Sequence, residues 1–312
     1  MTDFVVPDSF SRFANQVQRR FEMLLKKHVI TGIDLNDLRL WWRNFESEEE
    51  LYLAAHLLDS LVYRTNAMLD SSSHHILHMI LPNVLEKLGK RRWSDLTQFL
   101  KLIHSGSNTL KMRFLAVEGK FLEANGTFAH PVGKSGSTLL RTFARATSVP
   151  NRLLMHPDEI CALDADIDVL IFIDDCLGTG TQFLKFARAY ELATQSKNRT
   201  LVYIPFVAHI NGVSELKKQL PNLVVSPVEL LGSGTDFFAG HSENPNVWHR
   251  DKLNTAKSVE HFYIEFLKRK GLRNPISNYC LNLSLAFEIS TPNNTLKAFY
   301  SKEGNWNKLF VR

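Results

Sequence analysis

Cysteine is scarce in this chain of 312 residues, and long apolar runs are missing from it. The three cysteines form no CxxC pair, so the sequence supports neither a disulfide framework nor a zinc knuckle. No stretch approaches the roughly 20 apolar residues that span a bilayer. The first residues carry no basic start followed by an apolar run, so no signal peptide is expected. These absences predict a cytoplasmic protein that does not bind a membrane.

A strong excess of charge of either sign is also absent. The 37 Lys and Arg residues face 32 Asp and Glu residues, which leaves a net charge of +5. This balance is compatible with a nucleic-acid or phosphate ligand but does not require one, because a solvated surface explains it about equally well. Hydrophobic residues make up 44% and charged residues 22%, as in ordinary globular proteins, so a disordered chain is not expected.

The first third of the chain has the pattern of helices. Apolar residues recur at helical spacing near the start, and Ser47 with Glu50 forms a capping-box pattern ahead of a predicted helix over residues 51–68. Another helix is expected over residues 96–103. We assign residues 1–107 to an α-helical N-terminal module.

From residue 108 the pattern changes to strands that alternate with helices. Residues 169–173 form an unbroken apolar run, which is typical of a central parallel strand covered on both faces. Further strands are expected over residues 110–117, 201–207 and 223–231. This order predicts an α/β fold with a doubly wound parallel sheet, so that residues 108–312 form one domain with a C-terminal extension.

The strongest local signal for chemistry is the loop that follows the central strand. Two acids, Asp174 and Asp175, end the strand, and a short loop with two glycines and two threonines leads into a helix. The loop residues are Gly178, Thr179, Gly180, Thr181 and Gln182. Open α/β sheets bind ligands at the carboxyl ends of their strands, and the free amides at a helix start can surround a phosphate. The two carboxylates suit the hydroxyls of a ribose, or a Mg²⁺ ion beside them.

This run resembles the phosphoribosyl-diphosphate signature of type I phosphoribosyltransferases, in which an apolar strand, an acid pair and a Thr-Gly loop follow in the same order. The resemblance implies a phosphoribosyltransferase-like core. It also implies that Asp174 and Asp175 hold the ribose or a metal ion during catalysis. Residues 178–182 would then hold the 5-phosphate of phosphoribosyl diphosphate or of a nucleotide. Many purine-type members carry Asp where this chain has Gly178, so transfer to a base stays open.

A second loop, at residues 133–136, combines glycines with a lysine. It is not a Walker A motif, because Phe128 stands where that motif requires a glycine. The segment precedes the signature by one strand-helix unit, where the resemblance places a diphosphate-contacting loop. Lys134, Ser135 and Gly136 would then contact a diphosphate. A solvent-facing turn that caps a helix explains the segment equally well.

Two basic clusters stand out, at residues 90–92 and within residues 268–273. Either cluster could contact a nucleic-acid backbone. Either could instead end a helix, where cations complement the helix dipole. The sequence favours the second interpretation for both clusters.

The C-terminal stretch at residues 285–296, followed by Asn305, Trp306 and Asn307, is rich in short polar side chains that bond their own backbone. A structural turn explains it. Together with the helical start and the signature, it also resembles a subgroup of phosphoribosyltransferase-like proteins of bacterial conflict systems. That resemblance implies a retron-type anti-phage defence component, with a reverse transcriptase–msDNA complex or another defence protein as partner. The alternative is a catalytically inactive scaffold that binds retron nucleic acid or a partner protein.

Overall fold

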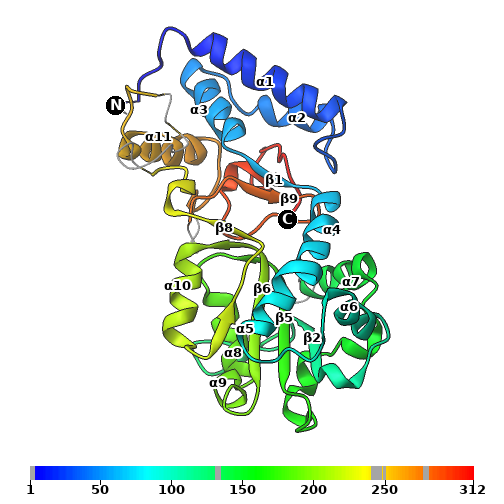
Figure 1. Ribbon diagram of the computed structural model, residues 1–312. Coiled ribbons are helices and arrows are strands. Elements are labelled where there is room, and N and C mark those ends of the chain that lie inside the picture. The colour runs from blue at the N-terminus through cyan, green and yellow to red at the C-terminus, as the bar shows by residue number, and fades with distance from the viewer. Residues whose placement is uncertain (1–3, 131–134, 240–247, 249–250, 277–280) are drawn as a thin grey trace. The chain divides into compact units, whose positions relative to one another are not determined.

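The computed structural model describes residues 4–130, 135–239, 248, 251–276 and 281–312. Packing divides the chain into two compact units (Figure 1). Unit 1 combines Met1–Asn66 with Gly232–Arg312, and unit 2 is the continuous segment Ala67–Leu231. The sequence predicts a boundary at residue 107, where helices give way to strands that alternate with helices. The packing of the chain places the boundaries after residues 66 and 231.

Unit 1 is built from elements at both ends of the chain. The N-terminal part supplies α1 (Phe10–Lys26), α2 (Leu35–Trp42), α3 (Glu48–Asp59) and β1 (Val62–Arg64). The C-terminal part supplies η5 (Ser233–Thr235), α11 (Ala256–Arg269), β9 (Leu285–Phe287) and η6 (Lys297–Phe299). Strand β1 pairs in parallel with β9. The predicted helix over residues 51–68 is therefore interrupted after residue 59 by β1, and its last residues belong to α4, because a strand partner far away in the sequence leaves no local signal.

The core of unit 1 is rich in aromatic side chains. Trp41 of α2 stacks on Phe299, with 6.0 Å between ring centroids, and its Nε1 donates to the carbonyl oxygen of Ala298 at 2.7 Å. Trp306 Nε1 donates to the same oxygen at 3.0 Å. One carbonyl thus satisfies two buried indole donors, and the C-terminal stretch is part of the hydrophobic core.

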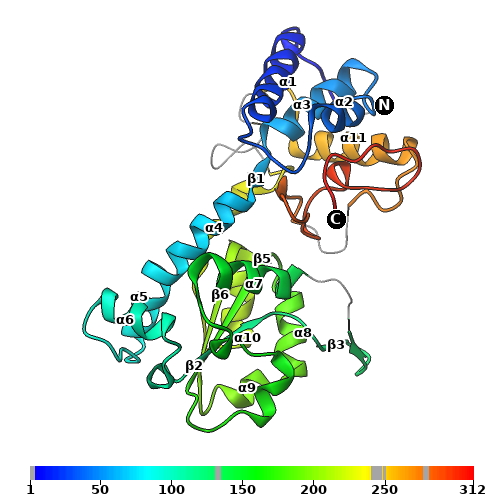
Figure 2. The same cartoon turned by 90° about the vertical axis from the view of Figure 1, so that its right-hand side faces the viewer.

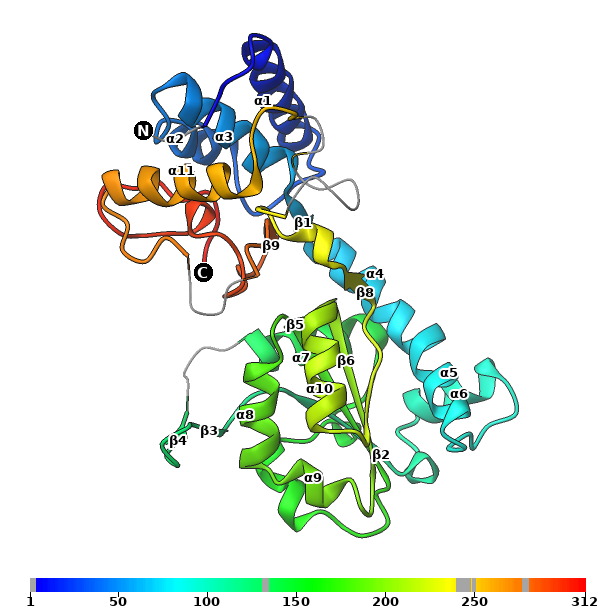
Figure 3. The same ribbon diagram turned by 90° about the vertical axis from the view of Figure 1, so that its left-hand side faces the viewer.

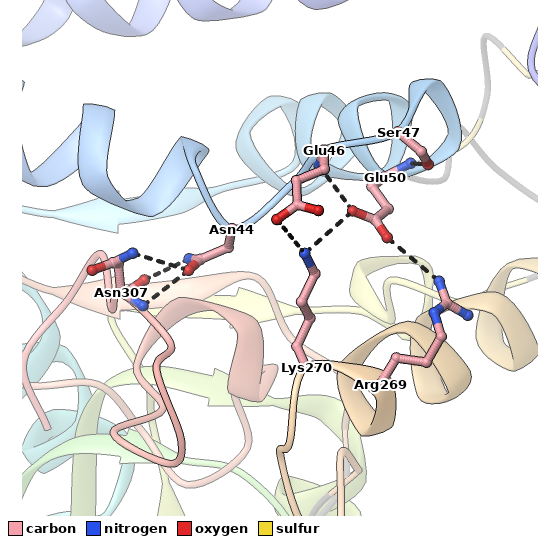
Figure 4. A network of polar contacts seen from close by, with 7 residues as sticks. All are labelled: Asn44, Glu46, Ser47, Glu50, Arg269, Lys270 and Asn307. Atoms are coloured by element: carbon pink, nitrogen blue, oxygen red, sulfur yellow. Dashed lines mark hydrogen bonds and ion pairs between the residues drawn. The ribbon is translucent and has the colours of Figure 1, made fainter.

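A polar network also joins the two ends of the chain within unit 1 (Figure 4). Asn44 Nδ2 donates to the carbonyl oxygen of Asn307 at 2.8 Å, and Asn307 N donates back to Asn44 Oδ1 at 3.0 Å. Lys270 Nζ lies 3.1 Å from Glu46 Oε1 and 3.7 Å from Glu50 Oε2. The N-terminal helices and the C-terminal segment therefore fold as one body.

Unit 2 contains a five-stranded sheet whose strands are parallel. Its strands are β2 (Met112–Ala116), β5 (Val169–Leu177), β6 (Thr200–His209), β7 (Leu223–Val225) and β8 (Glu229–Leu231). The order is β2-β5-β6-β7, and β8 pairs with the end of β6. The predicted α/β fold with a parallel sheet is confirmed. The single strand expected over residues 223–231 is two strands, and Pro227 lies between them, where it cannot donate a ladder hydrogen bond.

The helices of unit 2 precede and connect these strands. Before the sheet come α4 (Asn66–His75), the π-helical turn η1 (Ile76–Ile80), α5 (Leu81–Lys87), α6 (Leu96–His104) and η2 (Asn108–Leu110). Between the strands lie α7 (Ser135–Thr147), η3 (Asn151–Leu153), η4 (Pro157–Ala162), α8 (Thr181–Ala189), α9 (Leu192–Gln195) and α10 (Ile210–Gln219). A hairpin of β3 (Phe121–Leu122) and β4 (Phe128–Ala129) lies beside α8, where Lys185 pairs with Glu123 (Figure 2).

Helices cover both faces of the sheet. On one face Phe143 of α7 contacts Phe114 of β2, with 5.5 Å between ring centroids. On the other face Phe183 of α8 contacts Phe172 of β5 at 5.8 Å, and α8 and α10 lie in front of the sheet in Figure 3. Phe114 and Phe172 point to opposite faces, because Phe114 is in register with Ile171. Neighbouring strands β2 and β5 are therefore followed by helices on opposite faces, which makes their carboxyl ends a topological switch point.

Candidate functional site

Strand β5 carries the acid pair to the carboxyl edge of the sheet. Ile173 is in register with Ala116 of β2 on one side and with Ile204 of β6 on the other. Because parallel strands end at the same edge, the residues that follow β2, β5 and β6 lie together there. The predicted loop after β5 therefore lies at the switch point, where open α/β sheets bind their ligands.

The shape of this loop depends on glycines. Gly180 has a φ of 85°, in the left-handed region that favours glycine, and it caps the start of α8. Gly178 packs against α10, so closely that a Cβ on Gly212 would lie 2.1 Å from the carbonyl oxygen of Gly178. Gly212 was not identified from the sequence, because a close approach between two backbones leaves no local pattern.

The loop gathers hydrogen-bond donors at the start of α8. Thr179 Oγ1 and Thr181 Oγ1 lie 3.0 Å apart, and Thr181 and Gln182 are exposed. The first amides of a helix have no intrahelical carbonyl partner, and they form the positive end of its dipole. These hydroxyls and amides together provide the donors that a phosphate requires.

Asp174 is the more buried acid of the pair, with 3% of its surface exposed. Tyr203 of β6 donates its hydroxyl to Asp174 Oδ2 at 2.8 Å, and the amide of Asp175 donates to Oδ1 at 3.1 Å. Burial raises the pKa of Asp174 well above its usual range, and the negative charge of Asp175 raises it further. Burial, followed by the charge of Asp174, also raises the pKa of Tyr203. The hydrogen bonds from Tyr203 and from the Asp175 amide hold both carboxyl oxygens of Asp174 and offset part of the rise in its pKa.

Asp175 has different surroundings. Its side chain is half-buried, and Oδ1 accepts a hydrogen bond from the amide of Cys176 at 2.8 Å. Successive strand residues point to opposite faces, so the two acids diverge instead of converging on one point. Of the two, Asp175 is the acid that a ligand at the edge of the sheet can reach.

A metal ion at this edge needs ligands from outside the protein. Within the part of the chain that the structure describes, no group of three or more His, Cys, Asp and Glu side chains could hold a metal ion. Mg²⁺ is commonly bound by one or two carboxylates together with water and substrate phosphates. Asp175 fits that mode as the accessible carboxylate, whereas Asp174 is buried and both its carboxyl oxygens already accept hydrogen bonds from the protein.

The described part of the segment predicted to contact a diphosphate, Ser135 and Gly136, lies at the neighbouring strand end. Lys134 is outside the described residues. Ser135 is the first residue of α7, and Gly136 is buried, so that a Cβ there would lie 3.2 Å from the carbonyl oxygen of Val117. Helix α7 therefore begins beside the end of β2. The structure brings Gly136 and the loop at residues 178–182 to the same edge of the sheet.

The comparison with known protein families agrees with this architecture. A family model described as PRTase-CE matches residues 38–312, which is most of the chain. The chain belongs to the PRTase-CE family. This family is phosphoribosyltransferase-like, and the match includes the sheet, the loop after β5 and the C-terminal stretch. No curated protein matches the chain. Among the described helices of this PRTase-CE protein, none has the length and apolar character needed to cross a membrane.

Glu118, which follows β2 at this edge of the sheet, was not identified from the sequence. Its Oε2 accepts a hydrogen bond from the amide of Ser137 at 3.0 Å, in the first turn of α7. A carboxylate of the protein thus accepts the hydrogen bond of one amide that an anion bound at this helix start would otherwise use. An acid directly after a predicted strand is the signal that could have identified it.

The two basic clusters of the PRTase-CE chain are engaged in ion pairs. Lys90 Nζ and an Arg92 guanidinium nitrogen lie 3.1 Å and 2.7 Å from Asp168 Oδ2. In unit 1, Arg269 lies 3.4 Å from Glu50 (Figure 4). These pairs support a structural role for both clusters, as the sequence favours.

Proposed function

We propose that this PRTase-CE protein binds a ribose-5-phosphate compound, either phosphoribosyl diphosphate or a nucleotide, together with Mg²⁺. The observation that supports the proposal is the meeting of an accessible acid, Asp175, with a Gly-Thr loop at the start of a helix. Both lie at the switch point between β2 and β5, and the chain belongs to a phosphoribosyltransferase-like family.

Each part of the site has a physical task in this proposal. Asp175 accepts hydrogen bonds from the ribose hydroxyls and binds Mg²⁺. Asp174 does not contact the ligand in this proposal; its carboxyl group accepts a hydrogen bond from the amide of Asp175 and so fixes the backbone of that residue. Residues 178–182 hold the 5-phosphate through amides and hydroxyls, and residues 134–136 contact the diphosphate.

The chemistry that fits this site is making or breaking a bond at the anomeric carbon of the ribose. In transfer, the bond from that carbon to the diphosphate breaks, and a bond to the acceptor forms. The transition state carries positive charge on the sugar, so positioning and charge supply most of the catalysis. Gly178 offers no side chain to act as a base, and the acceptor must therefore lose its proton to another group.

A second candidate function is a catalytically inactive scaffold. Gly178 favours it, since a phosphoribosyltransferase that uses a carboxylate as base at this position would have lost that group here. In this case the protein binds retron nucleic acid or a partner protein in a defence complex. The resemblance of the C-terminal stretch to proteins of bacterial conflict systems motivates an anti-phage role in either case.

Calorimetric titration with phosphoribosyl diphosphate and Mg²⁺ tests the first proposal. We expect saturable binding by the wild type and a loss of about tenfold or more in Asp175→Asn, because a hydrogen bond to a charged group contributes about 1.5–3 kcal/mol. The matched control is Asp166→Asn, since Asp166 is an exposed acid of the same unit. Full affinity in Asp175→Asn, or no binding of either phosphoribosyl diphosphate or a nucleotide by the wild type, would contradict the proposal.

Phage plating on cells that carry the gene with its neighbouring genes distinguishes the two functions. A defence enzyme loses protection in the Asp175→Asn variant, whereas a scaffold retains it. Equal plating with and without the gene would remove the defence role altogether. A neighbouring reverse transcriptase gene would identify the retron-type context.

A further inference from the structure

The positive charge of unit 2 is concentrated in one segment. Between residues 96 and 153, eight Lys and Arg residues stand against two Glu residues. In the remainder of unit 2, ten Lys and Arg residues stand against thirteen Asp and Glu residues. The segment comprises α6, the edge strand β2, the β3–β4 hairpin and α7. The net charge of +5 for the whole chain does not show this uneven distribution of charge.

Four exposed cations of this segment lie on α6, α7 and the turn after α7, and we call them the α6–α7 basic surface. They are Lys101, Arg141, Arg145 and Arg152. Lys101 and Arg145 lie in the last turns of α6 and α7, and Arg141 lies one turn before Arg145 on the same helix face.

The carboxyl-terminal ends of α6 and α7 meet, which gathers these cations. His104 Nε2, at the end of α6, lies 3.2 Å from the carbonyl oxygen of Thr147, at the end of α7. The side chain of Arg152 lies against the backbone of Gly106, just after α6, so closely that a Cβ there would lie 1.9 Å from Arg152 Nε. Residues from both helices and from the following turn thus contribute to one continuous surface.

The acids of the segment do not neutralise this surface. Glu118 accepts from the amide of Ser137 at the start of α7, and Glu123 pairs with Lys185 of α8. Across the described part of the chain, none of the four cations lies within 4.0 Å of an acidic oxygen. This distinguishes the α6–α7 basic surface from the clusters at residues 90–92 and 268–270, whose cations are paired.

Two simpler explanations account for only part of the pattern. The helix dipole favours cations in the last turn, which covers Lys101 and Arg145 but not Arg141, a turn earlier, or Arg152, outside the helix. An anionic membrane would also attract cations, but binding there needs apolar anchors. Within residues 96–153 the described exposed large hydrophobic side chains are Leu96, at the start of α6, and Phe128, in β4, and none lies on α7 or in the last turn of α6.

We propose that the α6–α7 basic surface binds the phosphate backbone of a nucleic acid. Exposed cations spread over two helices suit an extended polyanion better than a single phosphate, and contacts to phosphates alone give little sequence preference. The surface is separate from the ligand site, because α7 begins beside the end of β2 and its last turn lies away from that edge. The inference therefore does not depend on the proposed ribose-phosphate ligand.

Fluorescence anisotropy with a labelled oligonucleotide of roughly 20 nucleotides tests the inference, in single-stranded and duplex forms and over a range of salt concentrations. The test variant combines Lys101→Gln, Arg141→Gln and Arg145→Gln, and leaves Arg152 in place because it packs on Gly106. The control variant removes the same charge from exposed lysines elsewhere in unit 2. Its substitutions are Lys197→Gln, Lys217→Gln and Lys218→Gln.

We expect the wild type to bind more weakly as salt increases. The test variant should lose about tenfold or more in affinity, and the slope of log K against log salt should fall by about 2–3. The control should stay within about twofold of the wild type, and both variants should bind phosphoribosyl diphosphate as the wild type does. Equal losses in the two variants would overturn the inference, as would binding to phosphatidylserine vesicles without binding to either oligonucleotide.

Discussion

At the scale of single residues, Asp174 and Asp175 are adjacent in the sequence but differ in their surroundings. Asp174 is buried in the sheet and accepts the hydroxyl hydrogen of Tyr203, whereas Asp175 is half-buried at the end of the strand. The same chemical group is thus a buried support in one position and an accessible acceptor in the next. The two adjacent acids are visible in the sequence, but the difference in their surroundings depends on Tyr203 in the neighbouring strand.

The raised pKa of Asp174 predicts a specific dependence of stability on pH. An unfolded Asp ionises near pH 4, whereas the folded Asp174 keeps its proton to a higher pH because of burial. The contribution of Asp174 is therefore complete below about pH 4 and is lost as pH rises toward the folded pKa, by at most about 1.4 kcal/mol per pH unit.

Asp174→Asn should lack this loss, because an amide has no proton to release. We expect urea unfolding to show the free energy of unfolding of the variant rising relative to the wild type as pH increases above about 4. Asp166→Asn serves as the exposed control and should follow the wild type. Parallel pH profiles for Asp174→Asn and the wild type would show that Asp174 is ionised in the folded protein.

Gly212 makes a second prediction at the residue scale. Any side chain there meets the carbonyl oxygen of Gly178, which belongs to the backbone and cannot rotate away. Gly212→Ala should destabilise the protein by about 1–3 kcal/mol and displace the loop after β5. Thermal unfolding and titration with phosphoribosyl diphosphate check both effects. Gly232→Ala is the control, because a Cβ at Gly232 meets no heavy atom within 4 Å, and a similar loss in the control would disprove the steric explanation.

At the scale of elements, local sequence patterns predict where most helices and strands lie, and the predicted bounds are wrong where strands pair over a long range. The apolar run at residues 169–173 predicts a strand, and β5 begins at Val169 as expected but continues to Leu177, because β6 pairs with its polar end. The helical pattern that begins after Ser47 ends at Asp59, since β9 pairs with residues 62–64. Each error lies where a partner from another part of the chain supplies the hydrogen bonds.

The C-terminal stretch gives a prediction at this scale. Trp306 is buried among the aromatic rings of unit 1, where it contacts Phe45 and Phe266, and its indole nitrogen bonds Ala298. Trp306→Ala should cost about 3–5 kcal/mol of the free energy of unfolding, through lost burial and a cavity. Chemical denaturation followed by circular dichroism measures this cost. Lys302→Ala changes an exposed residue of the same stretch and should cost less than about 0.5 kcal/mol.

At the scale of the whole molecule, the chain leaves unit 1 after residue 66 and returns to it at residue 232. Unit 2 is therefore a continuous segment inserted into unit 1. The sequence predicts a boundary at residue 107 between the helical part and the alternating strands and helices, but α4, α5 and α6 belong to the same unit as the sheet. The composition of a helix does not show which neighbour its apolar face covers.

Removal of residues 281–312 tests this organisation. The shortened chain lacks β9 and the aromatic side chains that cover α2, so the N-terminal helices should lose their protection. We expect limited proteolysis to cleave within residues 10–59 many times faster than in the full chain, while fragments of unit 2 persist. Unchanged resistance of the N-terminal helices would show that they fold without the C-terminal segment.

The class of the fold, the central strand and the loop that follows it can be predicted from the amino-acid sequence alone. These features depend on local hydrophobic periodicity and on glycines and acids at close spacing. Packing, in contrast, sets the contact between buried Asp174 and Tyr203, the support that Gly212 gives to Gly178, and the core shared by both ends of the chain. Burial and close approach depend on residues distant in the sequence, and these residues meet only when the chain folds.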